Sequence, residues 1–254
     1  IMFMGLACAS LVAGMSHASL TSYVVRHFAE ILLAIALFFV VVNTIRTPGQ
    51  LRQIVAVATL AGFASAGAGI FLNVIPPAWA ARFLSMLGRL GYPTGPGVLR
   101  YIEDNPDLPM RAISTSVDPN VLGGLLVLMG GLLAPQLLAR RPLFRRWMVV
   151  GMLGTITLCL YLTYSRAAMA GLVAGLGLLG LLKYRKLLVI LALAGALFLV
   201  LPSTQAYVAR AFEGLRGEDR ATQMRLGEYK DAFTLIQRRP WFGVGFAGTP
   251  DIDT

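Results

Sequence analysis

Apolar and polar positions alternate in long blocks along this sequence. The apolar runs predict membrane-spanning helices at residues 1–16, 28–45, 54–75, 119–138, 147–164, 167–182 and 187–201. The first, sixth and seventh runs are short for a hydrocarbon core of roughly 30 Å, which truncation, tilt or a locally thin bilayer explains. The pattern therefore predicts an all-α fold, a polytopic transmembrane bundle with seven such runs.

The apolar run between Arg146 and Lys183 contains one charged residue, Arg166. Its 36 residues would form a helix of about 54 Å, far longer than a bilayer core. The run therefore predicts two helices folded as a hairpin, with Tyr164, Ser165 and Arg166 in the turn. A turn at the membrane surface also spares the arginine the cost of a bilayer centre, about 2.5 kcal/mol or more.

A helical periodicity follows the last predicted span. Apolar side chains recur at three- and four-residue steps, at Leu226, Tyr229, Phe233 and Ile236. Pro240 stops this amphipathic helix just after two arginines, a residue type favoured at a helix C-terminus. We expect the helix to face outward and to lie along the membrane–water interface.

Arg225 falls in the first turn that we expect for this helix. The helix dipole disfavours a cation there, and an anionic ligand would give the arginine a reason for its position. In an empty site, mutual repulsion of the outer arginines should leave at least one of them paired with an outer acid, for example Arg225 with Glu228 one turn along.

Composition supports the membrane interpretation. Hydrophobic residues make up 57% of the chain and charged residues 13%, and the mean hydropathy is +0.71, which excludes a soluble globular domain. Cys8 and Cys159 lie in apolar segments whose spacing indicates neither a disulfide nor a metal site. We divide the chain into a transmembrane region, 1–201, with an outward loop at 76–118, and the start of a large outward loop, 202–254. Both ends look cut, so we expect a fragment of a longer protein.

The distribution of the net charge of +10 predicts a topology. Three short loops hold nine cations and no acid: Arg46 and Arg52, then Arg140, Arg141, Arg145 and Arg146, then Lys183, Arg185 and Lys186. Basic loops face the cytoplasm, so the Arg166 turn and segments 17–27, 76–118 and 202–254 face outward. Charges spread over loops in this way do not form the contiguous basic face of a protein that binds nucleic acid.

The segment before the fourth span carries the sequence Asp118-Pro119-Asn120. Aspartate is a favourable N-cap and proline suits the first helical position, so helix capping explains this motif. Capping leaves Arg111 unexplained, because it stands seven residues upstream in a polar loop. Arg111 is either a solvated charge or a ligand contact.

Three arginines, Arg111, Arg166 and Arg225, thus share the outer face without an evident structural role. A guanidinium group binds phosphate oxygens bidentately and stays charged at physiological pH. A cluster of arginines at the membrane surface fits a lipid-linked pyrophosphate, and snorkelling or solvated arginines are the alternative. If the three serve one pyrophosphate, they should converge on a single outward-facing cleft.

Three motifs occur in one order along the chain. They read R-x-x-S-T-x-x-D-P-N-x-L-G before the fourth span, T-Y-S-R-A-A-M-A-G-L across the hairpin, and R-L-G-E-Y-K-D-A-F-T-L-I-Q-R-R-P-W-F-G-V-G-F after the last basic loop. With the predicted topology, this order resembles the O-antigen ligase and O-antigen polymerase family of bacterial membrane glycosyltransferases, over residues from about 111 to 248.

The resemblance implies a metal-independent membrane enzyme that uses no cofactor. It implies transfer of a glycan from an undecaprenyl-pyrophosphate carrier to an acceptor sugar hydroxyl, on lipid A-core or on a growing glycan, at the outer face of the bacterial cytoplasmic membrane. By motif position, Arg111, Arg166 and Arg225 would hold the pyrophosphate, and Arg166 and Arg225 would be catalytic. Fixed cations aimed at the departing pyrophosphate stabilise the charge that develops in the transition state.

The chain departs from the family pattern in one respect. Ligase members carry a histidine late in the large outer loop, proposed to activate the acceptor hydroxyl, whereas His17 and His27 lie near the N-terminus and receive no role. Ligation, polymerisation and protein O-oligosaccharyl transfer all stay open. A transporter of a small anion or polysaccharide-related solute is a further alternative, although the predicted spans lack the mid-span charge typical of one. A non-catalytic membrane scaffold is the last.

Overall fold

The computed structural model describes residues 2–17, 19–217, 219–240 and 243–246. Over this part of the chain the secondary structure is helical, and its one β feature is an isolated antiparallel bridge between Tyr101 and Met110. The predicted all-α fold is confirmed. The chain divides into two compact units, Ile1–Leu51 with Gly217–Thr254, and Arg52–Arg216.

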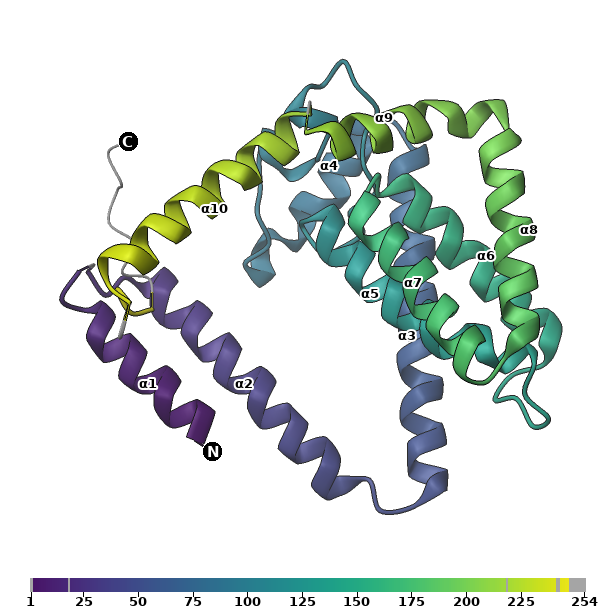
Figure 1. Ribbon diagram of the computed structural model, residues 1–254, viewed down its shortest axis with the longest axis horizontal. Helices are drawn as coiled ribbons and strands as arrows, with labels where there is room; N and C mark the ends of the chain where they lie inside the picture. The colour runs from purple at the N-terminus through teal and green to yellow at the C-terminus, as the bar shows by residue number, and fades with distance from the viewer. Residues whose placement is uncertain (1, 18, 218, 241–242, 247–254) are drawn as a thin grey trace. The chain divides into compact units, whose positions relative to one another are not determined.

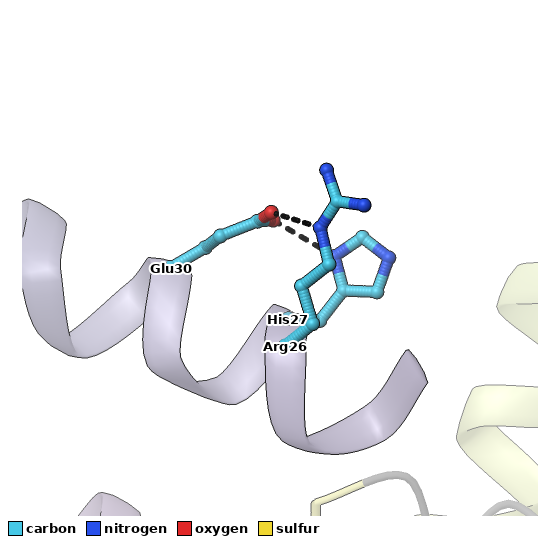
Figure 2. A network of polar contacts seen from close by, with 3 residues as sticks. All are labelled: Arg26, His27 and Glu30. Atoms are coloured by element: carbon cyan, nitrogen blue, oxygen red, sulfur yellow. Dashed lines mark hydrogen bonds and ion pairs between the residues drawn. The ribbon is translucent and has the colours of Figure 1, made fainter. Parts of the chain in front are cut away.

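The first unit contains α1 (Met2–Gly14), α2 (Ser22–Thr44) and α10 (Arg220–Arg238). Helix α2 begins after Thr21, whose hydroxyl accepts a hydrogen bond of 3.3 Å from the amide of Val24. Glu30 then contacts two side chains of the same helix, Arg26 Nε at 3.0 Å and His27 Nδ1 at 3.1 Å (Figure 2). These three polar residues lie in the first half of α2, before the apolar stretch from residue 31 to residue 42.

The second unit holds most of the helices of the chain. They are α3 (Pro48–Val74, which starts just before the unit), α4 (Pro77–Met86), α5 (Pro119–Leu133), α6 (Arg146–Leu162), α7 (Arg166–Leu182), α8 (Arg185–Val200) and α9 (Gln205–Arg216). Short 3₁₀ segments join them: η1 (Leu87–Leu90), η2 (Pro96–Val98), η3 (Ile102–Asp104), η4 (Ala134–Leu137) and η5 (Pro202–Thr204). Helix α5 packs against α6 and α7, and α7 packs against α8, with α9 lying across one end of this group (Figure 1).

Apolar faces of α5, α6 and α7 form the main core of the second unit. Leu122, Leu126 and Leu133 of α5 are fully buried, as are Ile156 and Leu160 of α6. Interdigitation of such side chains, rather than removal of apolar surface from water, is what holds helices together in a membrane. The core therefore fixes how the ends of these three helices are arranged.

Two glycines of α5 allow α7 to approach closely. A Cβ at Gly123 would lie 2.8 Å from the Cβ of Ala168, and a Cβ at Gly130 would lie 2.9 Å from Cδ1 of Leu172. Small residues at helix interfaces let backbones come together in this way. Since Ala168 follows Arg166 by two residues, the contact at Gly123 fixes the position at which α7 begins.

The structure supports the predicted number of membrane spans only in part. Three helices are long and apolar enough to cross a membrane within the described residues: Ser22–Thr44, Pro48–Val74 and Pro119–Leu137. Arg185–Val200 and Gln205–Gly214 would form a fourth candidate together, but they are bent by 99°. Met2–Gly14, Arg146–Leu162 and Arg166–Leu182 are apolar but shorter. The seven-span topology stays a prediction.

The apolar run with Arg166 at its middle does fold as two helices. Helix α6 ends at Leu162 and α7 begins at Arg166, so the predicted turn is confirmed at Tyr164 and Ser165, whereas Arg166 is the first residue of α7. Each helix has 17 residues, which corresponds to about 26 Å and to the short end of spanning helices.

The predicted outward loop at 76–118 is a folded segment and not an irregular connection. Helix α4 and the 3₁₀ segments gather a second core of Leu72, Ala80, Leu84, Val98 and Ile113. Pro77 opens α4 at its first position, where a proline is tolerated. This small core holds the polypeptide that leads to Arg111 and the start of α5.

Candidate functional site

The main chain around Arg111 is fixed on both sides. Asn73 of α3 donates a hydrogen bond of 2.8 Å from Nδ2 to the carbonyl oxygen of Met110. The amide of Ala112 donates to the carbonyl oxygen of Leu162, at the end of α6, at 2.8 Å. Arg111 is therefore held between α3 and α6 at one end of the second unit.

The side chain of Arg111 is anchored to the hairpin turn and to the first turn of α5. Its Nε donates to the carbonyl oxygen of Thr163 at 2.8 Å, and its Nη2 donates to Oδ1 of Asn120 at 3.2 Å. The carboxylate of Asp118 caps α5 as predicted, accepting from the amides of Asn120 and Val121 at 2.7 and 3.2 Å. The capping motif and Arg111, which the sequence left unconnected, thus form one polar cluster.

The electrostatic surroundings of Arg111 combine burial with charges of both signs. Burial lowers the pKa of its guanidinium group, Asp118 and Asp104 oppose that change, and the charge of Arg166 adds to it. Arginine remains protonated in any case. Arg111 bonds the carbonyl oxygen of Thr163, in the turn after which Arg166 begins α7, so the two arginines share one end of the unit.

Arg166 occupies the first position of α7. The preceding residue, Ser165, makes no side-chain cap, so a cation stands at the positive end of the helix dipole. Its Nη1 donates a hydrogen bond of 2.6 Å to the carbonyl oxygen of Arg210 in α9. A Cβ at Gly214, one turn further along α9, would lie 2.7 Å from the guanidinium carbon of Arg166. The arginine therefore fits under α9 only because residue 214 has no side chain.

Tyr207 of α9 is a site residue that the sequence did not reveal. Only 6% of it is exposed, and its hydroxyl has no hydrogen-bond partner among the described residues. Its ring stacks on Tyr161 and Tyr164 at centroid distances of 5.6 and 6.1 Å. The segment containing Tyr207 follows the last apolar run, and only its fold onto the hairpin brings the ring to the arginines.

The Tyr207 hydroxyl lies in the field of both arginines. Burial raises the pKa of Tyr207 to about 12, and the charges of Arg166 and Arg111 act against that rise. The phenol is thus protonated at neutral pH and can donate a hydrogen bond. A buried donor without an acceptor is costly, so its presence beside two cations points to an anionic acceptor.

Backbone strain is concentrated at the same place. Tyr164, in the hairpin turn, has φ 52°, and Val117, just before the α5 cap, has φ 64°. Left-handed backbone is disfavoured for residues with a side chain and most of all for a β-branched one. Such conformations persist where surrounding contacts impose them, commonly at binding and catalytic sites.

Arg225 belongs to the first unit, so its predicted convergence with Arg111 and Arg166 stays a prediction. The expected position in the first helical turn is wrong. Helix α10 starts earlier, at Arg220, because Asp219 accepts a hydrogen bond from the amide of Thr222 and caps it. Arg225 therefore lies in the second turn, and the dipole argument applies to Arg166 instead.

The amphipathic helix itself is present. Its stripe of Leu226, Tyr229, Phe233 and Ile236 is exposed, between 49% and 66%. Arg225 is exposed as well, and within the described residues it does not form the ion pair with Glu228 that we named as an example. The interfacial position of α10 stays a prediction.

The two histidines have other contacts in the first unit. His27 contacts Glu30, and Nε2 of His17 is the hydrogen-bond partner of Arg239. Cys8 and Cys159 are free thiols. In the part of the chain that the structure describes, no three histidine, cysteine, aspartate or glutamate side chains gather as a metal site would require.

Comparison with known proteins gives one match. Residues 147–253, which include the hairpin turn, α9 and α10, match the family model described as O-antigen ligase. No curated protein and no solved structure matches the chain.

Proposed function

We propose that this chain, which the O-antigen ligase domain at residues 147–253 assigns to that family, transfers a glycan from an undecaprenyl-pyrophosphate carrier to a sugar hydroxyl. The family supports an enzyme of the O-antigen ligase type in a multi-pass membrane protein. The carrier, the acceptor on lipid A-core or a growing glycan, and the outer face of the cytoplasmic membrane are parts of the proposal. The observation that carries it is the position of Arg111 and Arg166, the arginine pair, at one hairpin turn, together with the unpartnered buried hydroxyl of Tyr207.

The reaction breaks one bond and forms another at the anomeric carbon. The acceptor hydroxyl oxygen attacks that carbon, the bond to the diphosphate oxygen breaks, and its electron pair stays on the diphosphate. The proton of the hydroxyl passes to a base or to water. Negative charge grows on the leaving group, and donors aimed at it contribute roughly a hundredfold to a thousandfold each in rate.

Arg111 and Arg166 supply such donors in this proposal. The protein engages Nε and Nη2 of Arg111, which leaves the N–H groups of Nη1 to face the diphosphate. Arg166 adds a second guanidinium group, and Tyr207 adds a neutral donor. Arg225 keeps a proposed role as a third pyrophosphate ligand and catalytic cation, which rests on its position in the family motif. Because arginines provide the positive charge, we propose that transfer needs no divalent metal.

The arrangement of the second unit supports an outward-facing site. The loops that hold Arg140–Arg146 and Lys183–Lys186 lie at the ends of α5, α6 and α7 opposite to the hairpin turn at 163–165 (Figure 1). Basic loops favour the cytoplasmic side of a membrane. The arginine pair would then face outward, where a lipid-linked glycan awaits transfer.

One feature favours the transporter alternative. The bend of 99° between α8 and α9 resembles a broken span, a device that transporters use at their binding sites. An experiment on the purified protein separates the two functions, since a transporter would move solute across a liposome membrane without forming a glycosidic bond.

The decisive experiment is a transfer assay with the protein reconstituted in liposomes. It would follow glycan-acceptor product and released undecaprenyl diphosphate, for the wild type and for Arg111→Gln and Arg166→Gln. We expect each substitution to lower the rate at least a hundredfold, and Arg216→Gln, an exposed arginine of α9, to change it less than twofold. EDTA should leave the wild-type rate intact. Wild-type rates in both arginine variants would refute the proposed site, and solute flux without product would establish a transporter.

A further inference from the structure

A concavity opens at the other end of the second unit, away from the arginine pair. Its volume is about 640 Å³, within the range of small-molecule sites. The η4 segment, the start of α6 and the turn between α7 and α8 surround it. Its lining consists of Leu137, Leu138, Arg146, Leu181, Leu182, Lys183, Tyr184, Arg185 and Lys186.

The charged residues of this lining are all cationic. It holds four side chains that carry positive charge and no acidic residue: Arg146, Lys183, Arg185 and Lys186. Among the described residues, none of the four forms an ion pair with a carboxylate. Lys183 instead lies over the ring of Tyr184, 5.6 Å from its centroid. Like charges around one concavity repel, so an anion inside it would be bound favourably.

The remaining part of the lining is apolar. Leu137 ends the 3₁₀ segment η4 and Leu138 follows it, whereas Leu181 and Leu182 lie at the end of α7. Leu181 and Leu182 are 69% and 76% exposed, so the structure leaves their side chains uncovered. A soluble anion gains nothing from leucines beside its binding site. A phospholipid has both parts, a charged headgroup and an acyl chain that lies along apolar side chains.

The alternative explanation is that these cations only determine which side of the membrane the loops face. That explanation accounts for basic residues in the loops. It does not account for a concavity that the cations share with exposed leucines. Arg140 and Arg141 fit it, since both are basic loop residues that do not line the concavity. The chain thus offers a matched pair of cations for comparison.

We propose that this concavity binds an anionic phospholipid, with its phosphodiester held by Arg146, Lys183, Arg185 and Lys186 and an acyl chain along the leucines. Basic pockets between the cytoplasmic ends of membrane helices recognise lipid headgroups in this manner. The single negative charge of a bound lipid would offset part of the positive charge of the cluster, and the lipid would link the η4 segment to the turn between α7 and α8. The proposal does not depend on the transfer reaction, which takes place at the other end of the unit.

Native mass spectrometry of the purified full chain in neutral detergent tests this site. The probes are phosphatidylglycerol, phosphatidylcholine and inorganic phosphate. We expect phosphatidylglycerol to bind at least tenfold more tightly than phosphatidylcholine, and Lys183→Gln with Arg185→Gln to weaken it at least tenfold. Arg140→Gln with Arg141→Gln removes the same charge and should weaken binding less than threefold. Equal effects of the two charge pairs, or no preference for the anionic lipid, would overturn the proposal.

A second variant tests the apolar half without changing the charge. Leu182→Gln should weaken binding of long-chain phosphatidylglycerol several-fold and leave binding of a short-chain analogue unchanged. Displacement of the lipid by millimolar inorganic phosphate, or equal affinity for both chain lengths in Leu182→Gln and wild type, would show a site for a soluble anion and refute the lipid. Melting temperatures in detergent establish that every variant compared is folded.

Discussion

Arg111 donates a hydrogen bond of 2.8 Å from Nε to the carbonyl oxygen of Thr163. This bond crosses from the segment before α5 to the hairpin turn from which Arg166 starts α7. The carbonyl groups at the end of α6 carry partial negative charge and lack helical partners, so a guanidinium group is a suitable donor to them. One contact thereby sets the spacing of the two arginines that the proposed reaction requires.

Substitution of Arg111 should separate its structural and chemical roles. Arg111→Lys keeps the charge but cannot bond Thr163 and Asn120 while also facing a diphosphate, so we expect the transfer rate to fall roughly tenfold to a hundredfold. Arg111→Gln removes the charge and should lower the rate further. Both rates are measured beside the melting temperature. If the two variants lost activity only in proportion to lost stability, Arg111 would be a structural tether alone.

Gly214→Ala should displace the Arg166 guanidinium group. The new Cβ would lie 2.7 Å from its central carbon, which forces the side chain away from the Arg210 carbonyl. We expect the transfer rate to fall by about tenfold or more, since small misplacements of a catalytic group are costly. Gly175→Ala in α7 is the control, because its Cβ meets nothing within 4 Å. Comparable activity of the two alanine variants would argue against a precise position for Arg166.

Tyr207→Phe should change stability and activity in opposite directions. Removal of a buried hydroxyl that lacks a partner relieves a desolvation cost, so we expect the ligand-free variant to melt at the same temperature or higher. If the hydroxyl donates to the diphosphate, the transfer rate should fall roughly tenfold to a hundredfold. The assay and a thermal melt are run on one preparation. An unchanged rate would leave Tyr207 as a packing residue of the aromatic cluster.

The sequence predicted the local elements of this site well and their assembly less well. The Asp118 cap, the proline at the first position of α5 and the break before Arg166 follow from residue types and from the length of the apolar run. Tyr207 is different, because its burial depends on α9 folding back over the hairpin, and nothing in the adjacent sequence encodes that contact.

Arg225 shows a second limit of the sequence. Its helix was placed by the apolar stripe, which begins at Leu226, whereas the cap at Asp219 adds polar turns before that stripe. Apolar periodicity marks the buried or membrane-facing part of a helix and says little about polar turns at its ends. The two short helices of the hairpin pose a similar problem, since 17 residues reach only about 26 Å and leave the span count open.

Alkaline pH should destabilise the protein partly through Tyr207. Its pKa is raised to about 12 in the folded protein, above the value of about 10 for an exposed tyrosine. The corresponding stability is fully present below pH 10 and is lost as the pH rises through 12, because the unfolded chain then releases the proton more readily. The melting temperature of Tyr207→Phe should therefore fall less than that of the wild type between pH 10 and 12. Equal decreases in the melting temperatures of the two proteins would show that the pKa of Tyr207 is not raised on folding.

Topology provides the last prediction, and its test needs no substrate. The nine cations of the three basic loops predict that those loops face the cytoplasm, so we expect Leu143 to be inaccessible from outside and Asp107 to be accessible. Changing either position to cysteine leaves every basic residue of the chain in place. The substitution Cys8→Ser removes the exposed native thiol. A membrane-impermeant maleimide should label Asp107→Cys in intact spheroplasts and Leu143→Cys only after permeabilisation. Ser165 is unsuitable as a reporter because it is only 4% exposed. The reverse labelling pattern would show that the arginine pair faces the cytoplasm, which would exclude transfer at the outer face.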